Sequence, residues 1–165
     1  MPKQLDNLIF DRTQSDVDRV KQLTAALVAG TATTAERAEF VAGLKGAYNA
    51  TDLNRVGAAV EYLTGVLHGM GYTVPTSPVT DWAEDSIQNT EQMAVYLDNI
   101  HKLRDCLPYV APDAPDSMGA LTWQQANAIE EILYRLEIIL QEIQAGYLIR
   151  RAATPFMIAG GVFNA

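Results

Sequence analysis

Apolar residues recur at steps of three and four positions in five stretches of the chain, which is the spacing of one face of an α-helix. The stretches lie at 13–30, 33–46, 49–71, 89–108 and 122–151. Each begins beside a threonine or asparagine, whose side chain can accept a hydrogen bond from the first helical turn. The pattern therefore predicts an all-α fold, a helical bundle of about five helices.

Two proline-containing linkers separate the last three stretches. Residues 72–86 contain two prolines and residues 108–119 contain three. Proline removes a backbone donor and clashes with the preceding turn, so neither linker can form a regular helix. We expect the second linker, with its three prolines, to be stiff and extended.

The last stretch carries a heptad seam. Its members step alternately by three and four positions, and Leu133, Leu140 and Tyr147 lie beside them, seven positions apart. The seam itself consists of Ile129, Ile132, Leu136, Ile139, Ile143 and Gly146. A face this broad is typical of a helix in a bundle core, and it also suits self-association with a second copy. The helix would be about 45 Å long at about 1.5 Å per residue.

The C-terminal end differs from the rest of the chain. Thr154-Pro155 interrupts the helical pattern, and residues 152–165 carry no charged side chain. The apolar members of this segment are Phe156, Met157, Ile158, Val162 and Phe163. We expect residues 1–151 to form the helical bundle domain and residues 152–165 to form an extended apolar arm. The arm would pack either on its own core or on a neighbouring molecule.

The charge balance and the short apolar runs each argue against one class of partner, nucleic acid and the membrane interior. The chain has 165 residues, 12 Lys+Arg and 20 Asp+Glu, for a formal net charge of -8. Without a basic stripe to neutralise phosphates, we expect no binding to nucleic acid. No apolar run approaches the length that spans a bilayer, and no signal peptide is evident, so we expect no membrane insertion.

The residue types that carry chemistry are sparse. Cys106 is the one cysteine and lies in an apolar helical pattern, as a buried small side chain would. His68 and His101 lack metal-ligand spacing, and neither a phosphate loop nor a nucleophile elbow occurs. We therefore expect no enzyme activity, no cofactor and no metal.

Polar residues near the apolar stripes have two interpretations. Asn54, Asn99 and Asn127 could form a ligand site, but we favour a role in holding linkers and helix ends. Trp82 beside Asp81 could contact a sugar through ring stacking and a carboxylate acceptor. The alternative is that Trp82 anchors the first proline linker onto the bundle.

Several strings of the sequence resemble a known family. They are Leu8–Val17, Tyr48–Leu63, Thr80–Trp82, Met93–Arg104 and Leu121–Leu133. They are similar to small structural proteins from the tail and baseplate regions of bacteriophages and prophages of Firmicutes and related gut bacteria. The resemblance implies a virion part, assembled in the host cytoplasm, and it supplies no catalytic residues.

The expectation is a non-enzymatic phage virion structural protein of a tail, baseplate or tail-fibre attachment. It would form a homo-oligomer, a trimer or ring, and contact other phage tail proteins. The contacts would involve Ile129, Ile132, Leu136, Ile139, Ile143, Phe156, Met157, Ile158, Val162 and Phe163. One alternative is a carbohydrate- or cell-wall-binding module of a host-recognition apparatus, with Trp82 and Asp81 at its site. Another is a small regulatory partner of a phage.

Overall fold

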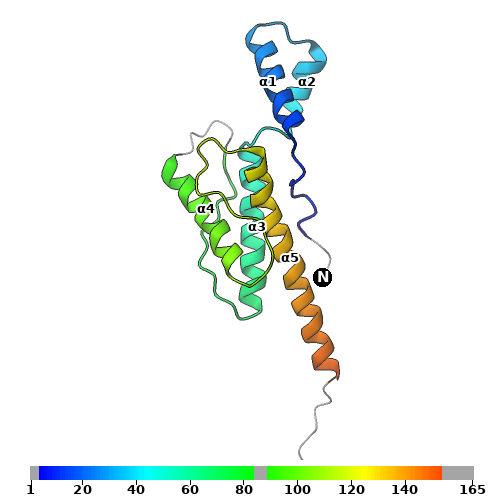
Figure 1. The fold of residues 1–165 in the computed structure, drawn as a ribbon, viewed down its shortest axis with the longest axis vertical. Helices are drawn as coiled ribbons and strands as arrows, with labels where there is room; N and C mark the ends of the chain where they lie inside the picture. Colours follow the sequence, from blue (N-terminus) through cyan, green and yellow to red (C-terminus); the bar gives the residue numbers. More distant parts are fainter. Residues whose placement is uncertain (1–3, 84–88, 154–165) are drawn as a thin grey trace, which may run out of the picture.

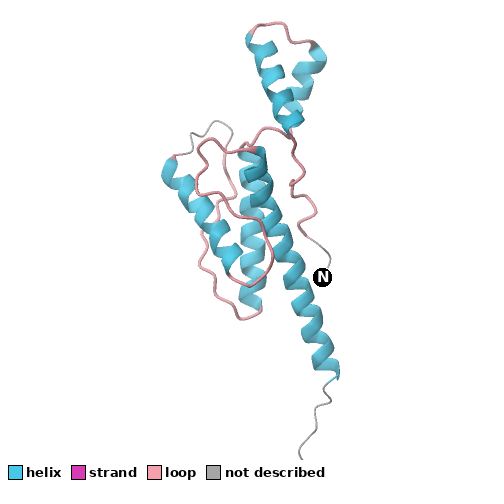
Figure 2. Cartoon of the chain, in the orientation of Figure 1, coloured by secondary structure: helices cyan, strands magenta, loops and turns pink. Residues whose placement is uncertain are grey.

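The computed structural model describes residues 4–83 and 89–153, with side chains to residue 148, and all of its regular structure is helical (Figures 1 and 2). The helices are α1 (Gln14–Val28), α2 (Thr34–Ala42), α3 (Ala50–Gly69), α4 (Thr90–Asp105) and α5 (Trp123–Ala153). Within the described ranges there is no strand. The predicted all-α class, five helices and long last helix are confirmed.

Reciprocal capping fixes where the helices begin. Thr13, Thr33, Asn49 and Asn89 each accept a hydrogen bond from the third helical residue, whose side chain accepts one in return. Thr122 and Gln125 exchange the same pair of bonds at the start of α5, at 2.9 and 3.2 Å. Each exchange satisfies two backbone donors that the helix leaves free, so the sequence itself defines these boundaries.

The five helices form two groups. Helices α3, α4 and α5 pack on one another as the body, whereas α1 and α2 pack together as a hairpin that projects beyond it (Figure 1). Arg55 and Tyr62 of α3 bond Glu130 and Glu137 of α5, so these two helices run parallel. The structure thus adds to the predicted bundle a division into a three-helix body and a separate hairpin.

The body contains nearly all of the core. Its central members include Val56, Leu63, Ile100, Ile129 and Leu136, all fully buried. In the hairpin, Leu23 is the only residue of α1 or α2 that is buried. Helices this short are marginal without tertiary packing, so the hairpin depends on its base and on polar ties.

The base of the hairpin is held by a close backbone approach and an ion pair. A Cβ atom on Gly46 would collide with the backbone carbonyl of Asp16, so glycine allows the loop before α3 to pass against α1. Across the hairpin, Nε of Arg19 donates to Oε1 of Glu39 at 2.9 Å.

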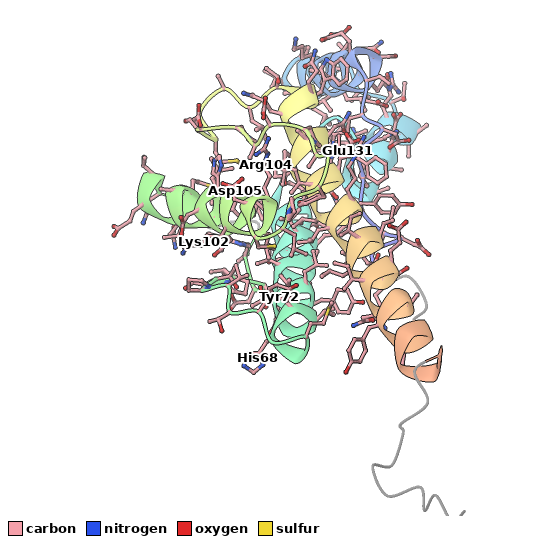
Figure 3. The ribbon with its side chains drawn as sticks, turned by 60° about the horizontal axis from the view of Figure 1, so that its bottom comes forward. His68, Tyr72, Lys102, Arg104, Asp105 and Glu131 are labelled. Atoms are coloured by element: carbon pink, nitrogen blue, oxygen red, sulfur yellow. The ribbon has the colours of Figure 1, made fainter. Side chains whose placement is uncertain are left out.

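Both proline linkers lack helix where the structure describes them, as predicted. Arg104, near the end of α4 (Figure 3), donates to the carbonyl oxygen of Pro112 at 2.8 Å and pairs with Asp113 at 2.6 Å. The ring nitrogen Nε2 of His101 lies 3.2 Å from the Pro115 carbonyl oxygen. Helix α4 therefore fixes the path of the second linker across the body.

The described helices include none that is both long enough and apolar enough to cross a membrane.

Candidate functional site

The most elaborate polar arrangement surrounds Arg12, which is 2% exposed. Its Nη2 lies 2.8 Å from Oδ1 of Asp52 and 2.8 Å from Oε1 of Glu130. Its Nε donates to the carbonyl oxygen of Lys45 at 3.1 Å, and its Nη1 donates to the carbonyl oxygen of Ile9. One side chain thus joins the N-terminal segment, the loop before α3, and helices α3 and α5.

Arg55 completes this ionic junction, which consists of Arg12, Asp52, Arg55 and Glu130. Its Nε and Nη2 donate to the two carboxylate oxygens of Glu130 at 2.9 and 2.8 Å, and Nη2 also contacts Asp52. Burial alone would lower the pKa of Arg55, but the hydrogen bonds and charges of Glu130 and Asp52 outweigh it and raise the pKa. Two cations therefore neutralise two carboxylates inside the protein.

Two tyrosines lie beside the junction. The guanidinium carbon of Arg12 lies 5.3 Å from the centre of the Tyr48 ring, and the Tyr48 and Tyr96 hydroxyl oxygens are 2.6 Å apart. Burial raises the pKa of Tyr48, and the charge of Glu130 raises it further. Burial likewise raises the pKa of Tyr96 well above its ordinary value. Both hydroxyls are therefore held in the neutral form.

Helix α5 binds the non-helical segment 4–12 through the backbone of that segment. Glu137 accepts hydrogen bonds from the backbone N–H groups of Gln4 at 2.7 Å and Leu5 at 3.3 Å. Glu130 accepts one from Ile9 at 2.7 Å. Leu5 and Leu8 are buried in the core between these bonds. The segment is therefore part of the folded body and supplies donors that two buried carboxylates need.

Each of the three asparagines singled out in the sequence binds both backbone groups of a single residue outside the helices. Asn54 pairs with Trp82 at 2.7 and 2.9 Å, and Asn99 pairs with Ser77 at 2.8 and 3.1 Å. Asn127 pairs with Arg12 at 3.0 and 2.9 Å. An amide matches a peptide group in this way because it offers one acceptor and one donor. Asn54 and Asn99 therefore hold the first linker and Asn127 holds the residue before the cap of α1, as predicted for linkers and helix ends.

The heptad seam changes character along α5. Ile129, Ile132 and Leu136 are fully buried in the chain's own core, so the bundle-core interpretation holds for them and they offer no surface to a partner. Ile139 is half-buried and Ile143 is 38% exposed. Tyr147 and Leu148 are 65% and 63% exposed. We call Ile143, Tyr147 and Leu148 the free-end patch.

The free-end patch lies where α5 runs past the other helices of the body (Figure 1). The exposed part of the predicted contact surface on α5 is therefore limited to the last turns of this helix. The other predicted contact residues, Phe156, Met157, Ile158, Val162 and Phe163, lie outside the described residues.

Trp82 is 9% exposed, so most of its ring belongs to the core, while Asp81 is exposed. Asn54 fixes the Trp82 backbone, as expected for an anchor of the linker. The ring lines a cavity of about 270 Å³ between this linker and α4. The indole Nε1 has no hydrogen-bond partner among the described residues. The sugar contact of Trp82 and Asp81 stays a prediction.

Cys106 is half-buried, its Sγ lies 3.0 Å from the carbonyl oxygen of Leu103, and burial raises its pKa. Among the described residues, no group of three or more His, Cys, Asp or Glu side chains is arranged to hold a metal ion. The acidic groups of the junction are already bonded to arginines, so the junction can fix geometry but has no free acid or base at its centre.

Sequence reasoning did not find the ionic junction or Glu137. The available signal was the seven-residue spacing of Glu130 and Glu137 beside the apolar seam, which places both on one face of α5. Arg12 gave no local signal, because its partners lie 40 and 118 positions away.

Comparison of the chain with family models, with curated proteins and with solved structures gave no match.

Proposed function

We propose that this chain is a non-enzymatic structural protein that assembles with copies of itself, as a part of a phage tail, baseplate or tail-fibre attachment. The observation that carries the assembly role is the free-end patch, in which Ile143 continues the buried heptad seam into solvent and two more large apolar side chains, Tyr147 and Leu148, are exposed one turn further on. An apolar helix face that extends beyond the helices on which it packs is typical of a contact surface. The phage setting rests on the family resemblance of the sequence.

Covering the free-end patch would supply enough free energy for a weak contact. Covering about 300 Å² of apolar surface contributes about 7.5 kcal/mol at about 25 cal/mol per Å². Association costs offset much of this, so the patch alone suits a weak contact. The uncharged arm, residues 152–165, follows directly and would add apolar area. A stable assembly therefore combines the free end of α5 with the arm.

The test of assembly uses the full chain. Tyr147→Glu places a carboxylate in the patch, and we expect it to abolish self-association that the wild type shows by size-exclusion chromatography with light scattering. Val110→Glu is the matched control, because the Val110 side chain is 83% exposed on the second linker, and the Val110 carbonyl oxygen meets α5 at Arg135, twelve positions before Tyr147. Equal association of both variants and the wild type would rule out the patch as the contact.

The test of the phage setting is mass spectrometry of purified particles with copy counting. We expect the copy number of the chain per particle to be a multiple of three, as for trimers, or a multiple of the number of subunits in a ring. Its absence from particles would refute a virion role and leave assembly in another setting.

A second candidate function is carbohydrate binding beside Trp82, favoured by the cavity that Trp82 lines and by its buried indole Nε1, which has no hydrogen-bond partner among the described residues. Trp82→Phe keeps an aromatic ring in the core but removes the N–H donor. Glycan-array binding by the wild type that this variant loses would support the candidate. A wild type that binds no glycan would eliminate it.

A further inference from the structure

A groove opens at the end of the body opposite to the free end of α5. It has a volume of about 460 Å³ and lies between the first turns of α4 and the residues that precede α5. Its apolar lining comes from Leu53, Met93, Leu97, Met118 and Leu121. Methionine side chains adapt to the shape of an apolar guest, so a groove with two of them suits an inserted apolar segment.

The polar groups of the groove suit an extended peptide without charges. Among the described residues that line it, Asp116 is the one with a charged side chain. Thr90 and Ser117 also line it, and their hydroxyls can bond main-chain groups of a guest. The C-terminal arm matches this chemistry, because it has no charged side chain and carries Phe156, Met157 and Ile158 as one apolar cluster.

The arm of the same chain cannot place that cluster in the groove. Leu121 of the groove lies just before α5, and the helix then runs 31 residues to Ala153. At about 1.5 Å per residue, its ends are about 45 Å apart. Ile158 is five residues past Ala153 and reaches at most about 18 Å from it, at about 3.6 Å per residue. A guest arm must therefore come from another molecule.

We propose that residues 156–158 of one copy dock in the α4–α5 groove of a second copy. This inference rests on the proposed self-assembly and specifies its contact. The groove and the last turn of α5, from which the donor arm continues, lie at opposite ends of the body (Figure 1), so the contact either repeats head to tail or closes as an antiparallel pair. Head-to-tail repetition gives a ring where the rotation closes and a filament where it does not.

Two single substitutions in the full chain test the docking. Ala94 lines the groove and is exposed, so Ala94→Glu adds a charge there without disturbing the core. Val95→Glu is the control, because Val95 is exposed on the same helix and does not line this groove. In the arm, Met157→Glu is compared with Asn164→Asp, which adds the same charge outside the cluster.

The readout is the protein concentration at half-assembly in sedimentation velocity. We expect Ala94→Glu and Met157→Glu each to raise it at least about tenfold, because a buried, unpaired carboxylate costs more than that factor. Both controls should match the wild type. An equal mixture of the two impaired variants should form a pair, since one supplies an intact arm and the other an intact groove.

The outcomes separate this inference from the proposed function. If the wild type assembles and Ala94→Glu assembles equally well, the groove is not the acceptor, although self-assembly stands. If the wild type remains a monomer at every concentration, self-assembly fails and the docking fails with it. Circular dichroism melts of each variant confirm that a lost assembly reflects the contact and not the fold.

Discussion

Nη2 of Arg12 lies 2.8 Å from Oε1 of Glu130, although the two residues are 118 positions apart and both side chains are almost wholly buried. This contact ties the segment before the first helix to the middle of the body. It also lies beside the loop through which the α1–α2 hairpin leaves that body, because Arg12 bonds the Lys45 carbonyl. The ionic junction therefore sets where the hairpin stands relative to the body.

Arg12→Ala should destabilise the protein by about 3 kcal/mol, because removing one member of a buried ionic network leaves carboxylates without their partner. Arg12→Lys should recover only part of this, since lysine lacks the planar fork that reaches several acceptors at once. Urea unfolding followed by circular dichroism measures both changes.

The control for the two Arg12 variants is Lys45→Ala. This change removes the exposed ion pair with Asp11 and keeps the Lys45 backbone carbonyl that accepts from Arg12. It should cost less than about 1 kcal/mol. A cost for Arg12→Ala as small as that of the control would contradict a structural role of the junction.

Glu137→Gln should loosen the N-terminal segment without unfolding the body. The glutamine keeps one acceptor oxygen and turns the other into a donor that opposes a backbone N–H, so the bond to Gln4 or to Leu5 is lost. Hydrogen exchange should rise at the amides of Gln4 and Leu5. Glu142→Gln, an exposed position on the same helix, should leave their exchange unchanged. Slow exchange at both amides in Glu137→Gln would count against this interpretation.

Asn99→Ala should cost about 1–3 kcal/mol, because both backbone groups of Ser77 lose their partner. Thermal melting measures the loss. Ser77→Ala serves as the control, since it changes a side chain and preserves the backbone groups that Asn99 binds. An undiminished melting temperature in Asn99→Ala would show that water replaces the amide at no cost.

Alkaline pH should destabilise the fold through its buried tyrosines. In the folded protein, burial raises the pKa of Tyr48, of Tyr96 and of Tyr109, a half-buried residue of the second linker whose hydroxyl donates to the Ile132 carbonyl oxygen at 3.3 Å. In the unfolded chain each ionises near its ordinary pKa of about 10. The unfolded state then binds fewer protons, so stability is complete below about pH 10 and falls as pH rises further.

Ultraviolet absorbance of tyrosinate measures this effect. The three buried hydroxyls should ionise together with loss of the circular dichroism signal, at a pH well above 10. Tyr96→Phe should reduce the height of that absorbance step by the contribution of one tyrosine. A gradual titration of all tyrosines in a still-folded protein would disprove their burial.

Local features of the fold could be predicted from the sequence, because they depend on neighbouring residues. Thr33 and Glu36 form a capping pair three positions apart, and the apolar steps of α3 define its buried face. The grouping of helices could not be predicted in the same way. Apolar spacing shows that a face such as that of Leu23 is covered but does not identify the covering element.

The candidate site was harder to predict, because its contacts also join residues that are far apart in the sequence. Glu130 and Glu137 read as ordinary charged residues of a solvated helix, and their burial depends on partners more than 70 positions away. The asparagines could be interpreted, since an amide within an apolar stripe needs a polar partner nearby. The seam of α5 predicted a contact face but not the point where the chain's own core ends and the free-end patch begins.

The central claim is that this protein assembles with itself through the free end of α5 and the arm that follows. Sedimentation velocity of the full chain over a wide concentration range tests it most directly, with Tyr147→Glu alongside. We expect the wild type to sediment as an oligomer whose share grows with concentration, and Tyr147→Glu to remain a monomer. A wild type that stays monomeric at every concentration would contradict it.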